Sequence, residues 1–542
     1  MCIVERFVPR LLIALIPEEV MNRYSSVTAL FNNSKLPDPD NGMDRSRYEG
    51  DRHRPQFHFT APEHWMNEPH APLYFNGQYH LFYQHNPIGP YWGNIHWGHA
   101  VSKDLVYWRD LPIALSPGKK DVDPDGCWSG SAVIDDEGFP LLFYTAGDHS
   151  KSPDQLIASA SSTFKKDGDN DLINWKKTDS PVIVQQEGQG WFGNFRDPFL
   201  WKEEDTWYML VGTGILGEGG TAILYTSENL SDWISRGYFY VGDYARYPKT
   251  GRMWELPVFL KLGKSGDGPD KYIFIINPWF GEPSEYYNKF MYYWLGTFDK
   301  EAFRFIPDDE IPQTFVYGEH FTGPSGFFDQ RGRAVLFSLI QDFRTDRQQF
   351  EAGWAHSAGL PIELKLNQDN QLAVAPIEEL SALRRKKLVE LTEKTMKETN
   401  TELQSVKGDM FEIILEIRPG SAGKYGIKLR CTEDGTEETL IYYDRIKREF
   451  NVDKTKSSLH PLVRKGIQGG IVDLDGELKL HIYVDHSVIE AYANQRKFIA
   501  TKVYPTRDDA LGIQILGDAG FLVKSIEVWT LGSIFETVPS QS

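Results

Sequence analysis

The sequence predicts an all-β protein in which a five-bladed β-propeller is followed by a C-terminal β-sandwich. Strand-like apolar runs recur at a nearly constant spacing over about the first two thirds of the 542 residues. Beyond about residue 410 strands continue without that spacing, which indicates a second β domain of different architecture. Aromatic residues make up 13% of the chain, and this content favours all-β folds and sugar-stacking surfaces.

The repeat defines the first domain. Apolar runs bounded by turn residues begin at Tyr79, Leu141, Trp207, Tyr272 and Ala334, in steps of 62, 66, 65 and 62 residues. A second series, in which Leu follows Asp or Asn and Trp comes three residues later, recurs at 104–108, 171–175 and 229–233. Short strands at this period, without helical periodicity between them, are typical of propeller blades rather than of a helical solenoid. Five repeats therefore predict five blades within residues 55–362.

The remaining segments flank this domain. Residues 363–408 are charged and, from 377 to 397, compatible with a helix, so we expect a linker there. Residues 409–542 alternate apolar and polar positions and are expected to form the β-sandwich, which either packs against the propeller or binds sugar. Residues 1–54 combine an apolar patch with a stretch rich in Pro, Asp and Asn, and form an N-terminal extension whose structure the sequence does not predict.

The composition excludes several classes of function. A formal net charge of −18 repels nucleic acids and anionic membranes, so neither is an expected partner. No apolar run approaches the roughly 20 residues of a membrane span. The three cysteines are too few and too far apart for a disulfide framework or a zinc site. The short apolar run at 11–16 lacks a signal-peptide cleavage site, so the cytoplasm is favoured over secretion, although the sequence does not establish the compartment.

Three acidic residues recur in register with the repeat. Glu68, Asp197 and Glu255 each lie one or two residues before a proline. They are 129 and 58 residues apart, close to two repeats and one repeat, so we expect them at equivalent positions near the propeller axis, where they converge. The segments 125–131 and 317–320 are expected to fill the other two blade positions around the same pocket. The alternative is that acidic residues beside prolines merely cap strands and turns.

Three convergent carboxylates suit cleavage of a glycosidic bond, which needs a nucleophile, an acid/base and a group that holds sugar hydroxyls. Because the guanidinium of Arg196 neighbours Asp197 in the chain, we expect Asp197 to stay ionised and to hold hydroxyls. Glu255 has apolar sequence neighbours and is expected to be protonated near neutral pH, as an acid must be. The nearby tryptophans that either stack on sugar or belong to the core are Trp65, Trp92, Trp128 and Trp254.

The segments 65–69 (WMNEP), 195–198 (FRDP) and 254–257 (WELP) resemble the motifs of glycoside hydrolase family 32, the invertase, levanase and inulinase group. The similarity extends from about residue 56 to the C-terminus. It implies a five-bladed propeller followed by a β-sandwich, with Glu68 as nucleophile, Asp197 as transition-state stabiliser and Glu255 as acid/base. The residues that it implies for the fructose subsite are Asn67, Gln84, Trp92, Ser129 and Arg196.

The first motif departs from the family pattern, which has Asp where this chain has Glu68, and Asn-Gly where it has His70-Ala71. A Glu side chain reaches about 1 Å further than Asp, whereas retaining chemistry requires the two catalytic carboxyls about 5 to 5.5 Å apart. Because the surrounding motif residues are intact, we expect a compensated, active enzyme. His70 either hydrogen bonds within the pocket or is a structural histidine.

The sequence therefore predicts a retaining glycoside hydrolase that releases fructose from β-fructofuranosides, such as sucrose, inulin or levan, by double displacement. No metal or organic cofactor is implied. The expected partner is a fructose-containing oligo- or polysaccharide, and homo-oligomerisation is left open. The alternatives are a fructosyltransferase on the same scaffold and a non-catalytic fructan-binding protein in which Glu68 is a lost nucleophile.

Overall fold

The computed structural model describes residues 45–264, 268–281, 290–474 and 476–535, so most of the expected N-terminal extension, 1–54, lies outside the described residues. Within these ranges the strands form seven sheets. The helices are short, and none of those described is long and apolar enough to cross a membrane. They are η3 (Arg45–Tyr48), α2 (Phe164–Asp167), η4 (Pro248–Thr250), α3 (Asp346–Ala352), η5 (Glu378–Leu383) and α4 (Met396–Leu403).

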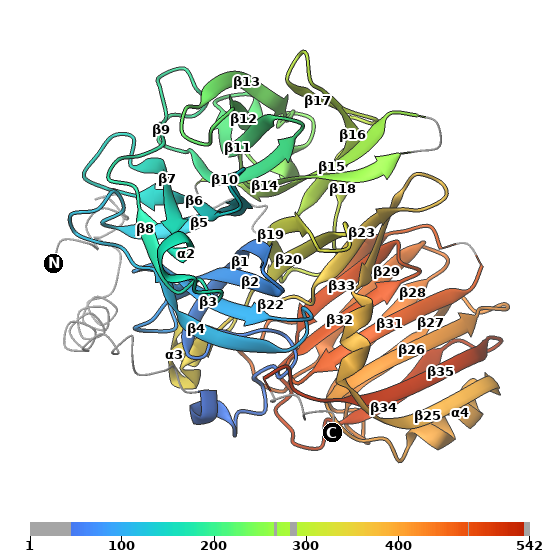
Figure 1. Cartoon of the computed structure of the whole chain (residues 1–542). Coiled ribbons are helices and arrows are strands. Elements are labelled where there is room, and N and C mark those ends of the chain that lie inside the picture. The colour runs from blue at the N-terminus through green and yellow to red at the C-terminus, as the bar shows by residue number, and fades with distance from the viewer. Residues whose placement is uncertain (1–44, 265–267, 282–289, 475, 536–542) are drawn as a thin grey trace, which may run out of the picture.

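Five sheets succeed one another along the chain, in the colour order from blue to yellow in Figure 1. The first comprises β1 (His64–Phe75), β2 (Gln78–Asn86), β3 (His96–Ser102), β4 (Trp108–Leu115) and β21 (Trp354–Ala355). The second comprises β5 (Gly126–Ile134), β6 (Pro140–Gly147), β7 (Gln155–Ser162), β8 (Trp175–Lys177) and β9 (Ile183–Val184). The third comprises β10 (Arg196–Glu203), β11 (Thr206–Ile215), β12 (Gly219–Ser227) and β13 (Ile234–Val241).

The other two of these sheets follow the same plan. The fourth comprises β14 (Met253–Lys264), β15 (Asp270–Trp279), β16 (Tyr292–Asp299), β17 (Arg304–Pro307) and β18 (Gln313–Thr314). The fifth comprises β19 (Phe321–Phe328), β20 (Ala334–Ile340), β22 (Ser357–Ala358), β23 (Ile362–Leu366) and β24 (Leu372–Pro376). Strands such as β2, β3 and β12 are buried along nearly their whole length, because neighbouring sheets cover both of their faces.

The first strand of each sheet contacts the first strand of the next. β1 contacts β5, β5 contacts β10, β10 contacts β14, β14 contacts β19, and β19 in turn contacts β1. In β21, Trp354 and Ala355 pair in parallel with His64 and Trp65 at the start of β1, so a segment late in the chain completes the first sheet. These contacts gather the five first strands around one common region.

The same irregularity interrupts each of these first strands. Their antiparallel register with the second strand slips at 66–69, 127–130, 196–199, 255–258 and 322–325. Such a bulge bends a strand and redirects its side chains, and it accommodates proline because the ladder is interrupted there. Glu68 and Asp197 lie within their bulges, and Glu255 is the last paired residue before its bulge, so all three lie at corresponding regions of their sheets.

Two further sheets form the C-terminal part, drawn in orange and red at one side of Figure 1. One comprises β25 (Arg384–Thr395), β26 (Met410–Arg418), β31 (Leu478–Asp485), β32 (Val488–Ala493), β33 (Lys497–Lys502) and β35 (Leu522–Leu531). The other comprises β27 (Lys424–Cys431), β28 (Glu438–Asp444), β29 (Glu449–Lys456), β30 (Ile467–Ile471) and β34 (Gly512–Gly517). One buried cluster takes residues from both sheets, including Ile413, Ile427 and Ile482, so they pack on each other as two layers.

The expected linker, 363–408, is divided between the two parts. β23 and β24 belong to the fifth sheet, and η5 and β25 follow them. The segment 377–397, which is compatible with a helix by composition, is thus mainly a strand that pairs with β35 along its length. Ladder hydrogen bonds and cross-strand contacts override the helix propensity of its Lys, Glu and Leu residues. The 3₁₀-helix η5 is the short helical part of this segment, and the α-helix α4 begins only at Met396.

Buried acidic side chains join the C-terminal sheets to the rest of the molecule. Asp485 accepts hydrogen bonds from the backbone N–H groups of Gln56, Phe57 and His58, each at 2.8 Å. Glu490 accepts one from the backbone N–H of Leu360 at 3.0 Å. Packing against the first part therefore accounts for these two carboxylates.

The segment 317–320, expected at the pocket, lies at this interface instead. Glu319 is buried and contacts Lys454 Nζ at 3.1 Å and Arg464 Nε at 2.6 Å, both from the C-terminal part. The prediction for this segment is wrong because it followed the nearest acidic residue. In the fifth sheet the bulge falls later, between Thr322 and Ser325, and contains Gly323.

Candidate active site

Three carboxylates from three sheets come together at the bulges. Glu68 belongs to β1, Asp197 to β10 and Glu255 to β14. The backbone N–H of Leu256 donates to Oδ2 of Asp197 at 3.1 Å, and the negative charges of Glu255 and Glu68 both act on Asp197. The side chains that the sequence repeat placed in register therefore form one acidic cluster.

Glu68 is oriented by hydrogen bonds to both carboxylate oxygens. Asn67 Nδ2 donates to Oε1 at 2.7 Å, and Ser129 Oγ, from β5, donates to Oε2 at 3.2 Å. Gln84 Nε2, from β2, donates in turn to Ser129 Oγ at 2.7 Å. Neighbouring sheets thus fix the direction of this carboxylate, as a nucleophile requires.

His70 belongs to the same network. Its Nδ1 lies 3.3 Å from Ser129 Oγ, and its ring packs 4.1 Å from the ring of Trp97, centre to centre. Burial lowers the pKa of His70 to about 3, so the imidazole is neutral in the working range of pH. Because Ser129 donates its only proton to Glu68, Nδ1–H is the donor that completes the network. This contact favours the pocket role for His70 over a purely structural one.

Glu255 lies among polar groups. Arg196 Nε and Nη2 donate to its Oε1 at 3.2 and 3.1 Å, and Asn277 Nδ2 donates to its Oε2 at 3.2 Å. The expectation of apolar surroundings is wrong because successive side chains of a strand point to opposite faces. Trp254 is fully buried on the opposite side, where its indole N–H donates to the Thr250 carbonyl.

Asp197 is buried, and its neighbour Arg196 directs its hydrogen bonds to Glu255 instead. Burial, opposed by Arg196 and assisted by the charges of Glu255 and Glu68, raises the pKa of Asp197 from 3.8 to about 8. The guanidinium of Arg196 thus does not hold the pKa of Asp197 at or below its usual value, as the sequence led us to expect. Its backbone N–H donates to Thr145 Oγ1 at 2.8 Å, which fixes a residue with a positive φ of 62°.

The tryptophans divide into exposed and core residues. Trp92 is 57% exposed, and its ring centre lies 6.3 Å from that of the half-buried Trp128, which together offer an aromatic surface for a sugar. Trp65, expected to bind substrate, is buried and packs with Ile95 and Ala355. A core role therefore accounts for Trp65, as burial does for Trp254.

The family models cover nearly all of the described chain. Residues 58–376 match the glycosyl hydrolases family 32 N-terminal domain, and residues 379–530 match the family 32 C-terminal domain. This chain belongs to glycosyl hydrolases family 32. The family predicted from the three motifs is thereby confirmed, and the protein is a glycoside hydrolase.

Relatives of this family 32 protein agree with that assignment. A sucrose-6-phosphate hydrolase of Zymomonas mobilis is 32% identical, over 88% of this chain and 92% of its own length. A levanase of Bacillus subtilis is 30% identical, over 92% of this chain and 73% of its own length. A fructan 1-exohydrolase IIa of Cichorium intybus, solved in complex with 1-kestose, shares the fold with a TM-score of 0.78 and 23% identity, over 89% of this chain and 98% of its own.

Sequence reasoning missed several groups that orient the family 32 carboxylates. Asn277 lies opposite Glu255 in the pairing of β14 with β15, a relation that only the register reveals. Gln155 accepts a hydrogen bond from Arg196 Nη1 at 3.0 Å, and no signal in the sequence marks it. Gly323 precedes a proline as Glu68 does, so comparison of the prolines alone could have found it.

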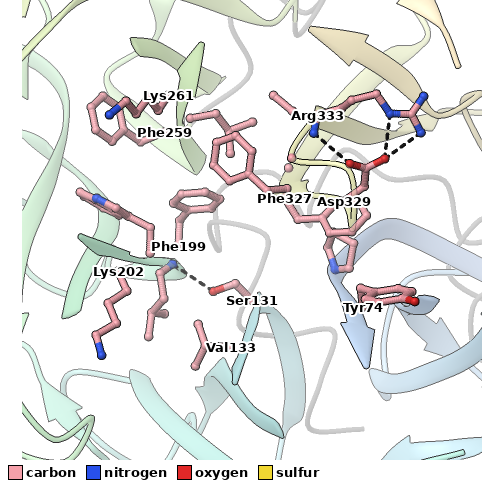
Figure 2. A pocket seen from close by; sticks show the side chains of 18 of the residues that line it. Tyr74, Ser131, Val133, Phe199, Lys202, Phe259, Lys261, Phe327, Asp329 and Arg333 are labelled. Carbon is pink, nitrogen blue, oxygen red and sulfur yellow. Dashed lines mark hydrogen bonds and ion pairs between the residues drawn. The ribbon is translucent and has the colours of Figure 1, made fainter. Parts of the chain in front are cut away.

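A separate cavity of about 840 Å³ opens further along the same first strands (Figure 2). Its walls are mostly apolar, with Phe199, Phe259 and Phe327 turned inward. Three acidic residues line it, Glu203, Asp329 and Glu363. Asp329 accepts a hydrogen bond from Arg333 Nε at 2.8 Å. None of the three clustered carboxylates lines this cavity. This cavity is therefore distinct from the acidic cluster of Glu68, Asp197 and Glu255.

Proposed function

We propose that this protein releases fructose from β-fructofuranosides by double displacement with retention. The observation that carries the proposal is the cluster of Glu68, Asp197 and Glu255, with hydrogen bond donors arranged on two of them. Its relatives are named sucrose-6-phosphate hydrolase, levanase and β-fructofuranosidase, and a fructosyl group is common to the substrates that these names denote.

The proposed reaction has two steps. Glu68 attacks the anomeric carbon of fructose while Glu255 protonates the departing oxygen, which leaves a fructosyl ester on Glu68. Glu255, now a base, takes a proton from water, and the water oxygen attacks the same carbon and frees Glu68. Two inversions give net retention. Arg196 and Asn277 hold Glu255 in place through both steps.

Asp197 serves as the residue that holds the sugar hydroxyls. With a pKa of about 8 it carries a proton at neutral pH and can donate one hydrogen bond as well as accept others. While it carries this proton, Asp197 adds no negative charge beside Glu68. Asn67, Gln84, Ser129 and Arg196 complete the proposed fructose subsite, and Trp92 with Trp128 forms its aromatic rim.

The proposed scaffold is a five-bladed propeller in which each of the first five sheets is one blade. The circuit of contacts from β1 through β5, β10, β14 and β19 back to β1 supports this arrangement. We assign residues 55–376 to the propeller and the β25 to β35 region to a β-sandwich that packs against it. The acidic cluster then lies at one end of the propeller axis.

The proposal is tested with purified protein and sucrose, sucrose 6-phosphate, inulin and levan, by measuring free fructose and larger sugars. Glu68→Gln and Glu255→Gln should each lower fructose release at least about 1,000-fold. Glu204→Gln is the matched control, because Glu204 is an exposed acidic residue that pairs with Lys300. p-Nitrophenyl β-fructofuranoside, whose leaving group needs no proton, should restore the first step to Glu255→Gln but not to Glu68→Gln.

The other outcomes contradict the proposal in distinct ways. Larger sugars in place of free fructose indicate a fructosyltransferase. Binding of inulin, measured by calorimetry, without any product indicates a fructan-binding protein. Full activity of Glu68→Gln removes Glu68 from the reaction.

A further inference from the structure

Gly323 stands where a side chain could not coexist with Glu68. It occupies the bulge of β19, before Pro324, as Glu68 occupies the bulge of β1 before Pro69. Its φ of +64° lies in the left-handed region. A Cβ at this position would lie 2.4 Å from Cγ of Glu68, 3.4 Å from its Cβ and 3.5 Å from its Cδ.

This approach cannot be relieved by moving Glu68 aside. Carbon atoms that are not bonded keep about 3.5 to 4 Å apart, so a separation of 2.4 Å forces one of them to shift. The contact falls on the γ-methylene in the middle of the side chain, and the carboxylate beyond it is held by Asn67 and Ser129. Any shift of Cγ therefore displaces the carboxylate or breaks its hydrogen bonds.

The segment that carries Gly323 is itself tied to Glu255. Thr322 Oγ1 donates to Asn277 Oδ1, and the backbone N–H of Gly323 lies 3.5 Å from the same oxygen. Asn277 uses its Nδ2 to bind Glu255. The backbone at Gly323 thus contacts the Glu68 side chain on one side and, on the other, Asn277, which hydrogen bonds to Glu255.

We propose that Gly323 is a positioning residue that provides the space for the γ-methylene of Glu68 and so sets the separation between the Glu68 and Glu255 carboxylates. The inference rests on the proposed function, in which these two groups are nucleophile and acid/base. The present position of Glu68 therefore depends on the absence of a side chain at position 323.

The alternative role for Gly323 is purely conformational, since a residue other than Gly costs roughly 1 kcal/mol or more at a positive φ. If the role is purely conformational, Gly323→Ala should cause the same loss of activity and stability whichever residue stands at position 68. A positioning role makes the effect of Gly323→Ala depend on the residue at position 68. The two roles therefore differ in whether the substitutions are additive.

The test compares the wild type, Gly323→Ala, Glu68→Ala and the double variant, by kcat, KM and Tm on the substrate cleaved fastest, with added formate replacing the missing nucleophile in the two Glu68→Ala proteins. Gly323→Ala should lower kcat about 100-fold with little change in KM, because a displacement of about 1 Å costs about that much. In the Glu68→Ala background, which has no Cγ at position 68, Gly323→Ala should leave the formate-restored rate unchanged within about two-fold.

The control is Gly332→Ala. Gly332 has a similar φ of +76° and nothing within 4 Å of a Cβ, so it should lose stability without losing kcat. Gly323→Asn separates strain from collision, because Asn tolerates a positive φ but carries a Cβ, and it should be as inactive as Gly323→Ala when Glu68 is present.

Equal losses from Gly323→Ala in both backgrounds would overturn the positioning role and leave the proposed function intact. Soluble protein recovered for Gly323→Ala only in combination with Glu68→Ala supports the inference, whereas failure to fold in both backgrounds overturns it. An active Glu68→Gln, measured separately, overturns the proposed nucleophile and the positioning role together.

Discussion

Asp197→Asn tests the buried proton of the acidic cluster. The pKa of Asp197 is about 8 in the folded protein and about 3.9 in an unfolded chain, so between these values the folded state keeps a proton that the unfolded state loses. Stability from this group is therefore fully present below about pH 4 and is lost as pH rises through about 8. Asn has the same shape and no carboxyl to titrate, so it is free of this loss.

The size of the effect follows from the raised pKa. One pKa unit corresponds to about 1.4 kcal/mol, so between pH 5 and pH 8 ionisation of Asp197 costs the wild type up to about 4 kcal/mol. Coupling to Glu68 and Glu255 distributes this cost over the cluster. Asp197→Asn should nearly match the wild-type Tm at pH 5 and exceed it by several degrees at pH 8.

The assay is thermal unfolding followed by tryptophan fluorescence from pH 5 to pH 8 at constant ionic strength. Asp342→Asn is the control, because Asp342 is also a buried carboxyl group. Burial alone would raise its pKa, but the positive charges of Arg344 and Lys502 outweigh burial and hold the pKa below its usual range. Its substitution should lower Tm equally at pH 5 and pH 8. Parallel Tm curves for the wild type and Asp197→Asn across this range would refute the raised pKa of Asp197.

Three further substitutions probe the contacts around the site and between the two parts. Arg196→Lys keeps the positive charge but loses the two hydrogen bonds from Arg196 to Glu255. Its kcat should therefore fall about 10- to 100-fold while Tm changes little. An unchanged kcat would contradict the role of Arg196 in positioning Glu255. Trp92→Ala should raise the KM for inulin about five-fold and the KM for sucrose by less. If both KM values rise equally, the aromatic rim of Trp92 and Trp128 does not recognise the longer sugar chain. Asp485→Ala leaves three buried backbone N–H groups without their acceptor and should lower the free energy of unfolding in urea by about 3 to 5 kcal/mol, whereas a loss below about 1 kcal/mol contradicts its bridging role.

The sequence was sufficient wherever a periodic pattern carries the information. The strand repeat and the prolines put Glu68, Asp197 and Glu255 in register, and the three side chains do form one cluster. The repeat succeeds because equivalent bulges recur at the same place in each sheet, so spacing along the chain translates into position in space.

Partners across strands could not be predicted, because they depend on pairing register and on the face to which a side chain points. Arg196 is adjacent to Asp197 in sequence, yet its side chain binds Glu255, because β14 lies beside β10 and brings Glu255 within reach. Glu319 looked like a fifth site residue and instead pairs with Lys454 of the C-terminal part. The 377–397 segment resembles a helix by composition, and only its contact with β35 makes most of it a strand.

The parallel pairing of β21 with β1 imposes an order on biosynthesis. The edge of β1 at His64 acquires its partner only when Trp354 has left the ribosome, 290 residues later. At about 5 to 20 residues per second this interval lasts roughly 15 to 60 seconds. During that time a hydrogen-bonding edge of the nascent chain stays exposed, and an exposed strand edge invites pairing with a neighbouring nascent chain. Slow translation between these two points therefore lengthens the period of aggregation risk for this polypeptide.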